Sequence, residues 1–122
     1  MTPEQQKVLE FHRTFGISIE VCPKIPESDV IRLRTSLIQE ELGEYIDACL
    51  ADDIIEVADA LGDLLYVVYG AAIAHGIDLE PVFNEIHRSN MTKVGGHKNE
   101  LGKWVKPATY EPAKIAEVLK GI

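Results

Sequence analysis

The apolar run from Ile54 to about Ala74 constrains the fold of this chain more than any other segment. Its aliphatic residues recur at three- and four-residue spacing and cover nearly the whole circumference of a helix, which is typical of a helix buried on more than one side. A chain of 122 residues offers little further protein to cover such a helix, so a partner subunit is expected to help. The run carries Glu56, Asp59 and Asp63, which argues against a membrane span.

Helical periodicity and capping residues predict three further main helices and a short terminal one. Long stretches without glycine or proline and an aromatic content of 7% favour helix over sheet. We therefore expect a single all-α domain, with a four-helix-bundle-type core over residues 28–93 and an irregular, basic C-terminal tail over residues 94–122. The expected main helices cover residues 2–15, 28–51, 54–74 and 78–93, and the short terminal helix covers residues 113–119.

Charge and cysteine content narrow the function classes. The chain has 12 basic and 20 acidic residues, and its net charge of −8 disfavours a general affinity for nucleic acid. No N-terminal stretch has the charged and then apolar character of a signal peptide, so we expect a cytoplasmic protein without membrane contact. Cys22 and Cys49 lack metal-type spacing, which predicts reduced thiols rather than a disulfide framework.

Acidic residues on two neighbouring predicted helices share one spacing. Glu41 and Glu44 form an E-x-x-E pair, Glu56 and Asp59 form an E-x-x-D pair, and residues three apart lie on one helical face. If the helices fold back around Leu50, Glu41 faces Asp59 and Glu44 faces Glu56, because the members of each pair lie equally far from that residue. Four like charges would then converge on one patch between packed helices.

Converging carboxylates repel one another by about 1–4 kcal/mol per pair near a surface, and a divalent cation compensates for this repulsion. Because every candidate ligand is a hard oxygen, the pattern favours Mg²⁺, with Mn²⁺ also compatible, over zinc or copper. Asp63, one turn beyond Asp59, is a candidate outer ligand. A di-iron bundle is excluded because no glutamate has a histidine three residues later. The alternative is an acidic face that is only solvated.

An all-carboxylate site of this kind suits phosphate chemistry, in which the metal neutralises phosphoryl oxygens and lowers the pKa of an attacking water. Glu40 precedes Glu41 and is rotated by about 100° around the helix, a position suited to orienting or deprotonating that water. The alternative role for Glu40 is that of a plain surface glutamate.

The motif E-E-x-x-E at residues 40–44, followed by E-x-x-D at residues 56–59, resembles the signature of the MazG-like all-α NTP pyrophosphohydrolases. The resemblance extends over residues 28–93. It implies a four-helix core, assembled as a homodimer or homotetramer, that uses Mg²⁺ to cleave a nucleotide between its α and β phosphates. By the same match, Glu41, Glu44, Glu56 and Asp59 would be the metal ligands and Glu40 the water-activating residue.

Residues beyond the acidic motifs supply candidate substrate contacts. The fourth predicted helix resembles that of smaller MazG-like and dUTPase-like members, and its Asn90 and Lys93 share a face suited to sugar or phosphate groups. Lys93 is also the candidate for stabilising charge on the departing pyrophosphate. Lys103 and Lys106 add positive charge, and Trp104 offers a flat surface for a base. Alternatively, these lysines only offset a negative surface and Trp104 anchors the tail.

We therefore expect a Mg²⁺-dependent hydrolase that converts an NTP or dNTP, including dUTP or non-standard nucleotides, to the monophosphate and pyrophosphate. A non-catalytic helical oligomerisation or adaptor module is the main alternative. A divalent-cation buffer is a third interpretation.

Overall fold

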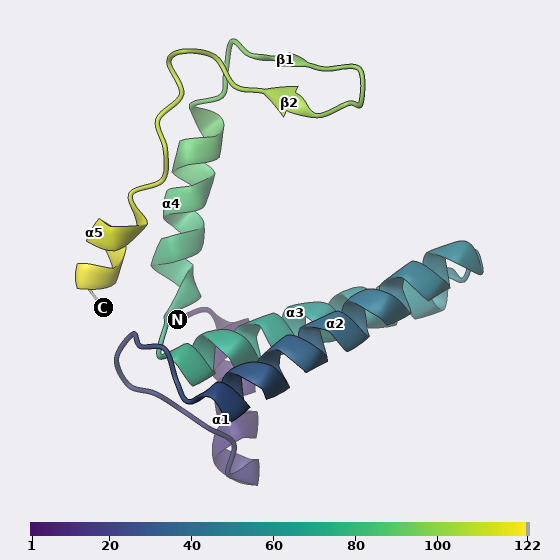
Figure 1. The fold of residues 1–122 in the computed structure, drawn as a ribbon, viewed down its shortest axis with the longest axis vertical. Coiled ribbons are helices and arrows are strands. Elements are labelled where there is room, and N and C mark those ends of the chain that lie inside the picture. The colour runs from purple at the N-terminus through teal and green to yellow at the C-terminus, as the bar shows by residue number, and fades with distance from the viewer. Residues whose placement is uncertain (122) are drawn as a thin grey trace. The chain divides into compact units, whose positions relative to one another are not determined.

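The computed structural model describes residues 1–121, so the end of the predicted tail at residue 122 lies outside it. The predicted all-α class is confirmed, because helices dominate and the only strands in the described part pair as one short hairpin. Figure 1 shows the elements along the chain. The chain divides into two compact units, Met1–Leu79 (unit 1) and a second that begins at Glu80 (unit 2), and each is described by itself. The helices are α1 (Pro3–Phe15), α2 (Ser28–Leu50), α3 (Ile54–His75), α4 (Leu79–Met91) and α5 (Ile115–Lys120); the strands are β1 (His97–Lys98) and β2 (Trp104–Val105).

Unit 1 is built on a hairpin of two long helices, α2 and α3, which lie side by side in Figure 1. The turn between them is tight, with Asp52 at a φ of 52°. Asp53 then caps α3 by accepting a hydrogen bond from the Glu56 backbone N–H at 3.1 Å. At its other end α3 stops at Gly76, whose φ of 71° lies in the left-handed region that favours glycine. A Cβ at this position would overlap the carbonyl of Cys22 in the loop between α1 and α2.

Helix α1 packs on α3 through a small and partly polar core. The Gln5 side chain is fully buried, donates to the Ile77 carbonyl at 2.7 Å, and accepts from the Leu79 backbone N–H at 3.0 Å. His12 is also buried, donates from Nδ1 to a backbone carbonyl, and accepts a 3.3 Å hydrogen bond from the buried Arg34 guanidinium. These polar contacts tie α1 to α2 and to the segment that follows α3.

The apolar surface of α3 is less buried within one chain than its sequence pattern predicts. Several of its large aliphatic side chains are about half-exposed or more: Leu61 is 49% exposed, Leu65 is 52% exposed, and Ile54 and Ile55 are each 76% exposed. By length and composition alone, α3 could also cross a membrane. In this structure 28% of its most apolar 18-residue stretch is buried. The reason for the difference is that α1 and α2 together cover only part of its circumference.

Unit 2 contains α4 apart from its first residue, the β1–β2 hairpin and α5, and side-chain hydrogen bonds to backbone groups connect α4 to the segments that follow it. The buried Ser89 hydroxyl donates to the Glu111 carbonyl at 2.7 Å, and the Trp104 indole Nε1–H donates to the Lys93 carbonyl at 2.8 Å. Helix α4 ends at Met91, before the predicted end near Lys93. The tail that was expected to be irregular therefore contains an ordered hairpin in addition to the predicted terminal helix.

Candidate active site

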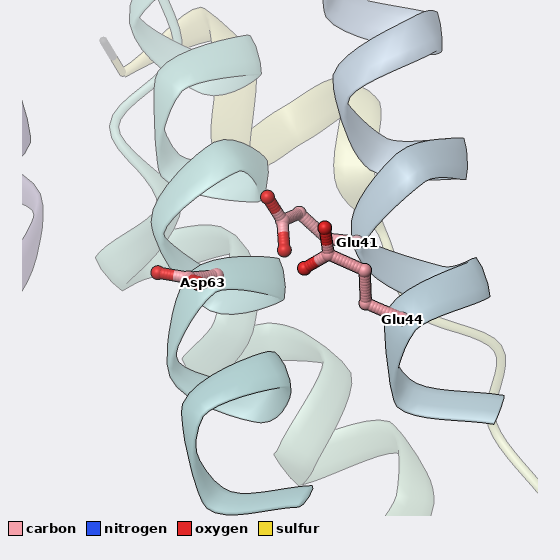
Figure 2. A group of neighbouring side chains, drawn as sticks. All are labelled: Glu41, Glu44 and Asp63. Carbon is pink, nitrogen blue, oxygen red and sulfur yellow. The ribbon is translucent and has the colours of Figure 1, made fainter. Parts of the chain in front are cut away.

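Three carboxylates converge across the α2–α3 hairpin. One ligand oxygen from each of Glu41, Glu44 and Asp63 lies within 4.8 Å of the other two. Figure 2 shows Glu41 and Glu44 reaching from α2 toward α3, which carries Asp63. We call these three residues the carboxylate cluster. The predicted convergence of acidic side chains between these two helices is thus present, with Asp63 as its member on α3.

The register of the hairpin explains why Asp63 takes this place. Because α2 ends at Leu50 and α3 begins at Ile54, the turn is centred on Asp52 rather than on Leu50. Glu41 and Asp63 lie equally far from Asp52 along the chain and therefore meet across the antiparallel pair. The sequence-based pairing of Glu41 with Asp59 assumed a turn centre that lies too early.

The other two predicted ligands, Glu56 and Asp59, lie beside the cluster. Both line a cleft of about 390 Å³ at the turn end of the hairpin, together with Glu44. Burial raises the pKa of Asp63, and the charge of Asp59 and a hydrogen bond between the two carboxyl groups raise it further, so Asp59 lies beside the cluster. The four predicted ligands therefore occupy one continuous acidic region, and which of them coordinate a metal stays a prediction.

Sequence reasoning missed Asp47, which lines the same cleft. The signal was present, since Asp47 extends the three-residue spacing of Glu41 and Glu44 by one more step. Glu40, the predicted water-activating residue, is exposed on α2 next to the cluster, and its charge contributes to the raised pKa of Glu41.

The electrostatics of the cluster are those of carboxylates that lack a counter-charge. Burial raises the pKa of Glu41 to about 7, assisted by a hydrogen bond with Glu44 and by the charges of Glu44 and Asp63. Burial, followed by the charge of Asp59, also raises the pKa of Asp63. In unit 1 as described, no lysine or arginine forms an ion pair with these residues.

The residues present fit a divalent cation. All donors are hard carboxylate oxygens, they converge to within 4.8 Å of one another, and Oε2 of Glu41 is buried without a hydrogen-bond partner. A cation would supply both the missing partner of that oxygen and the missing counter-charge. The donor set suits Mg²⁺ or Mn²⁺ and offers neither sulfur nor nitrogen to softer metals.

The predicted substrate contacts all lie in unit 2. Asn90 and Lys93, at the end of α4, line a cleft with Trp104, and Lys103 and Lys106 line an adjoining cleft that also includes Lys93 and Trp104. The structure thus brings these residues together with one another. Sequence reasoning missed Asn99, which lines the second cleft and whose side chain organises the hairpin loop.

Comparison with known proteins gives two findings. Residues 8–90 match the family described as phosphoribosyl-ATP pyrophosphohydrolase. The chain is also 41% identical over 81 residues to an uncharacterized protein of Acanthamoeba polyphaga mimivirus; the match covers 62% of this chain and 32% of the relative, so the chain spans about a third of that protein. The family match includes α2, α3 and every member of the carboxylate cluster, and it ends before the β1–β2 hairpin. Because it covers more than half of the sequence, this chain belongs to the phosphoribosyl-ATP pyrophosphohydrolase family, within the MazG-like all-α NTP pyrophosphatase superfamily.

Proposed function

We propose that this chain is a Mg²⁺-dependent nucleoside triphosphate pyrophosphohydrolase, which converts an NTP or dNTP to the monophosphate and pyrophosphate. Family membership points to pyrophosphohydrolase activity on a nucleotide-like substrate. The observation that carries the proposal is the carboxylate cluster, with oxygens of Glu41, Glu44 and Asp63 within 4.8 Å and one buried oxygen unpartnered. A repulsive group of acids in which one oxygen is withdrawn from water is what a cation site requires.

In this proposal Glu41, Glu44, Glu56 and Asp59 hold the metal, and Asp63 joins them through its position opposite Glu41. A bound Mg²⁺ or Mn²⁺ would neutralise charge on the phosphate oxygens and lower the pKa of an attacking water. The protein positions the cation with side chains from two helices that a tight, capped turn holds in register.

The exposed carboxylate of Glu40 accepts the proton of the attacking water in this scheme, since it lies beside Glu41 but is not part of the cluster. Stabilisation of the departing pyrophosphate by the Lys93 ammonium stays a prediction from the sequence. Phosphoribosyl-ATP, which gives the family its name, belongs in the substrate panel beside the common NTPs, dNTPs and dUTP.

We also propose a homo-oligomer, either a dimer or a tetramer, located in the cytoplasm. Support comes from the exposed apolar side chains of α3, such as Ile54 and Ile55, which a second copy of the same helix pair would remove from water. The acidic residues on α3, Glu56, Asp59 and Asp63, favour a protein surface over lipid as the covering partner.

The test is an assay of product release from the nucleotide panel with Mg²⁺ and with EDTA. Monophosphate and pyrophosphate are expected only with the metal, and Glu41→Gln should remove nearly all turnover while circular dichroism shows the helices intact. Glu10→Gln, which neutralises an exposed carboxylate on α1, is the matched control and should keep wild-type turnover. Release of orthophosphate and diphosphate would contradict the proposed cleavage position.

A comparison of Asp59→Asn with Asp63→Asn separates the two ligand assignments. Loss of turnover in both supports a shared acidic site, whereas wild-type activity in one removes that residue from the ligand set. If no nucleotide is hydrolysed, the adaptor interpretation is favoured. Metal binding that nucleotides do not affect would instead favour a cation buffer.

A further inference from the structure

The segment that follows the family match concentrates positive charge in an otherwise acidic protein. Between Lys93 and Lys106 the chain has four lysines and one acidic residue, Glu100. Lys93, Lys103 and Lys106 line a cleft of about 370 Å³ with Asn99, Trp104 and Tyr110, which we call the lysine cleft. Within the described residues of unit 2, none of these three lysines forms an ion pair with a carboxylate.

Two of the lysines gather around one aromatic ring. The Lys106 Nζ lies 4.6 Å from the Tyr110 ring centroid and the Lys93 Nζ lies 5.7 Å from it. Cation–π attraction offsets only part of the cost of holding like charges close together. In the described part of unit 2, the carboxylates of Glu85 and Glu111 pair with Arg88. The cleft therefore has the electrostatics of an anion-binding site.

The walls of the cleft are fixed by hydrogen bonds. The Asn99 side chain accepts from the backbone N–H groups of Leu101 and Lys103 at 2.9 and 3.0 Å, which sets the loop that carries Lys103. The Trp104 indole is held by its 2.8 Å hydrogen bond to the Lys93 carbonyl. Gly96 lies so close that a Cβ there would come within 2.7 Å of the indole nitrogen. A ligand would thus meet a preformed site and need to order little of it.

A second cleft adjoins the first and differs from it in chemistry. It has a volume of about 320 Å³, is lined by Met91, Val94 and Trp104 with Asn90, and shares both Trp104 and Lys93 with the lysine cleft. Trp104 is 43% exposed, so part of the indole is open to contact. A flat apolar surface next to a group of ammonium ions matches a nucleotide, which has a flat base at one end and phosphates at the other.

We propose that these two clefts form a nucleotide-binding site that does not require metal, with the phosphates at Lys93, Lys103 and Lys106 and the base against Trp104 and Val94. The inference rests on the proposed function for the class of ligand, a nucleoside triphosphate. It goes beyond that function by assigning recognition to a segment outside the family match. Both clefts lie wholly within unit 2.

Trp104 is the only tryptophan in the chain, so its fluorescence reports directly on this site. The experiment titrates the full chain with each of the four common NTPs in EDTA and at low salt. Saturable quenching by at least one NTP is expected, and inorganic tripolyphosphate should compete with it. Lys106→Ala should weaken binding by about fivefold or more, the effect of losing one ammonium–phosphate contact of about 1 kcal/mol.

Lys120→Ala is the matched control, because it removes the same charge from an exposed position on α5 that lines neither cleft. It should bind like the wild type. No saturable quenching at millimolar nucleotide would overturn the site, and so would equal losses in Lys106→Ala and the control. Adenosine that binds as tightly as ATP would overturn the role of the lysines.

Failure of this inference can be told apart from failure of the proposed hydrolase. Glu41→Gln should lose hydrolysis yet keep the quenching, because the carboxylate cluster takes no part in metal-free binding. Quenching without hydrolysis of any nucleotide would contradict the proposed function and support the nucleotide-binding site. If nucleotides do not quench the fluorescence and Lys106→Ala hydrolyses them with an unchanged KM, the nucleotide-binding site is contradicted and the hydrolase is supported.

Discussion

In metal-free protein, Glu41→Gln should make unit 1 more stable than the wild type. The Glu41 carboxyl lies half-buried against Glu44 and Asp63, and its Oε2 has no hydrogen-bond partner. Glutamine has nearly the same shape, carries no charge, and can donate from its amide to the Glu44 carboxylate. The substitution that abolishes the proposed activity should therefore relieve a repulsion that the fold tolerates.

The size and pH dependence of this gain follow from the pKa of Glu41, which the fold raises from its ordinary 4.5 to about 7. The folded state therefore binds the Glu41 proton more tightly than the unfolded state does, and wild-type stability falls as pH rises from 4.5 to 7. This full rise in pKa corresponds to a loss of at most about 3 kcal/mol in the free energy of unfolding. Solvent screening at this partly exposed carboxyl reduces the expected gain to about 1–2 kcal/mol.

Urea denaturation in EDTA, at pH values on either side of this window, measures the effect. The gain from Glu41→Gln should be present above pH 7 and absent below pH 4.5. Glu40→Gln is the matched control, because it removes an exposed charge one residue away and should change the free energy of unfolding by only a few tenths of a kcal/mol. Added Mg²⁺ should stabilise the wild type more than Glu41→Gln. A Glu41→Gln protein that is no more stable than the wild type above pH 7 would refute the reasoning.

Three further perturbations test other parts of the chain. Gly76→Ala should cost unit 1 roughly 2 kcal/mol or more in urea denaturation, because a Cβ at a φ of +71° would also overlap a crossing loop, and a loss below about 0.5 kcal/mol would contradict this. The Arg88 guanidinium holds the pKa of Glu85 at about 2, so Glu85 contributes stability above pH 4.5 that is lost as pH falls toward 2. Glu85→Gln should accordingly lower the thermal midpoint at neutral pH but not at pH 2, and equal midpoints at neutral pH would argue against it. Burial lowers the pKa of His12 and the Arg34 charge adds to this, so Arg34→Met should raise it in an imidazole NMR titration, and an unchanged or lower value would speak against the contact.

Local sequence signals were sufficient to predict the helices. Thr2 caps α1 by accepting from the Gln5 backbone N–H, Gly16 ends it in a left-handed conformation, and Asp53 and Gly76 bound α3. The β1–β2 hairpin was not predicted. Each strand has only two residues, too few to show a period of two, and the loop between them depends on hydrogen bonds to one asparagine side chain.

By itself, the sequence determined an all-α chain with acidic residues at three-residue spacing on two long helices, because helix periodicity and capping are local properties. Only the tertiary structure decided which acids meet. Moving the turn centre by two residues moves the partner of Glu41 by four residues, which is about one helical turn along the same face, so a turn centred on Asp52 rather than Leu50 brings Asp63 to Glu41. In the same way, the sequence shows that the tail is rich in lysine. Only the fold of unit 2 places Lys93 and Lys106 around the Tyr110 ring, since contacts between distant residues depend on the path of the chain.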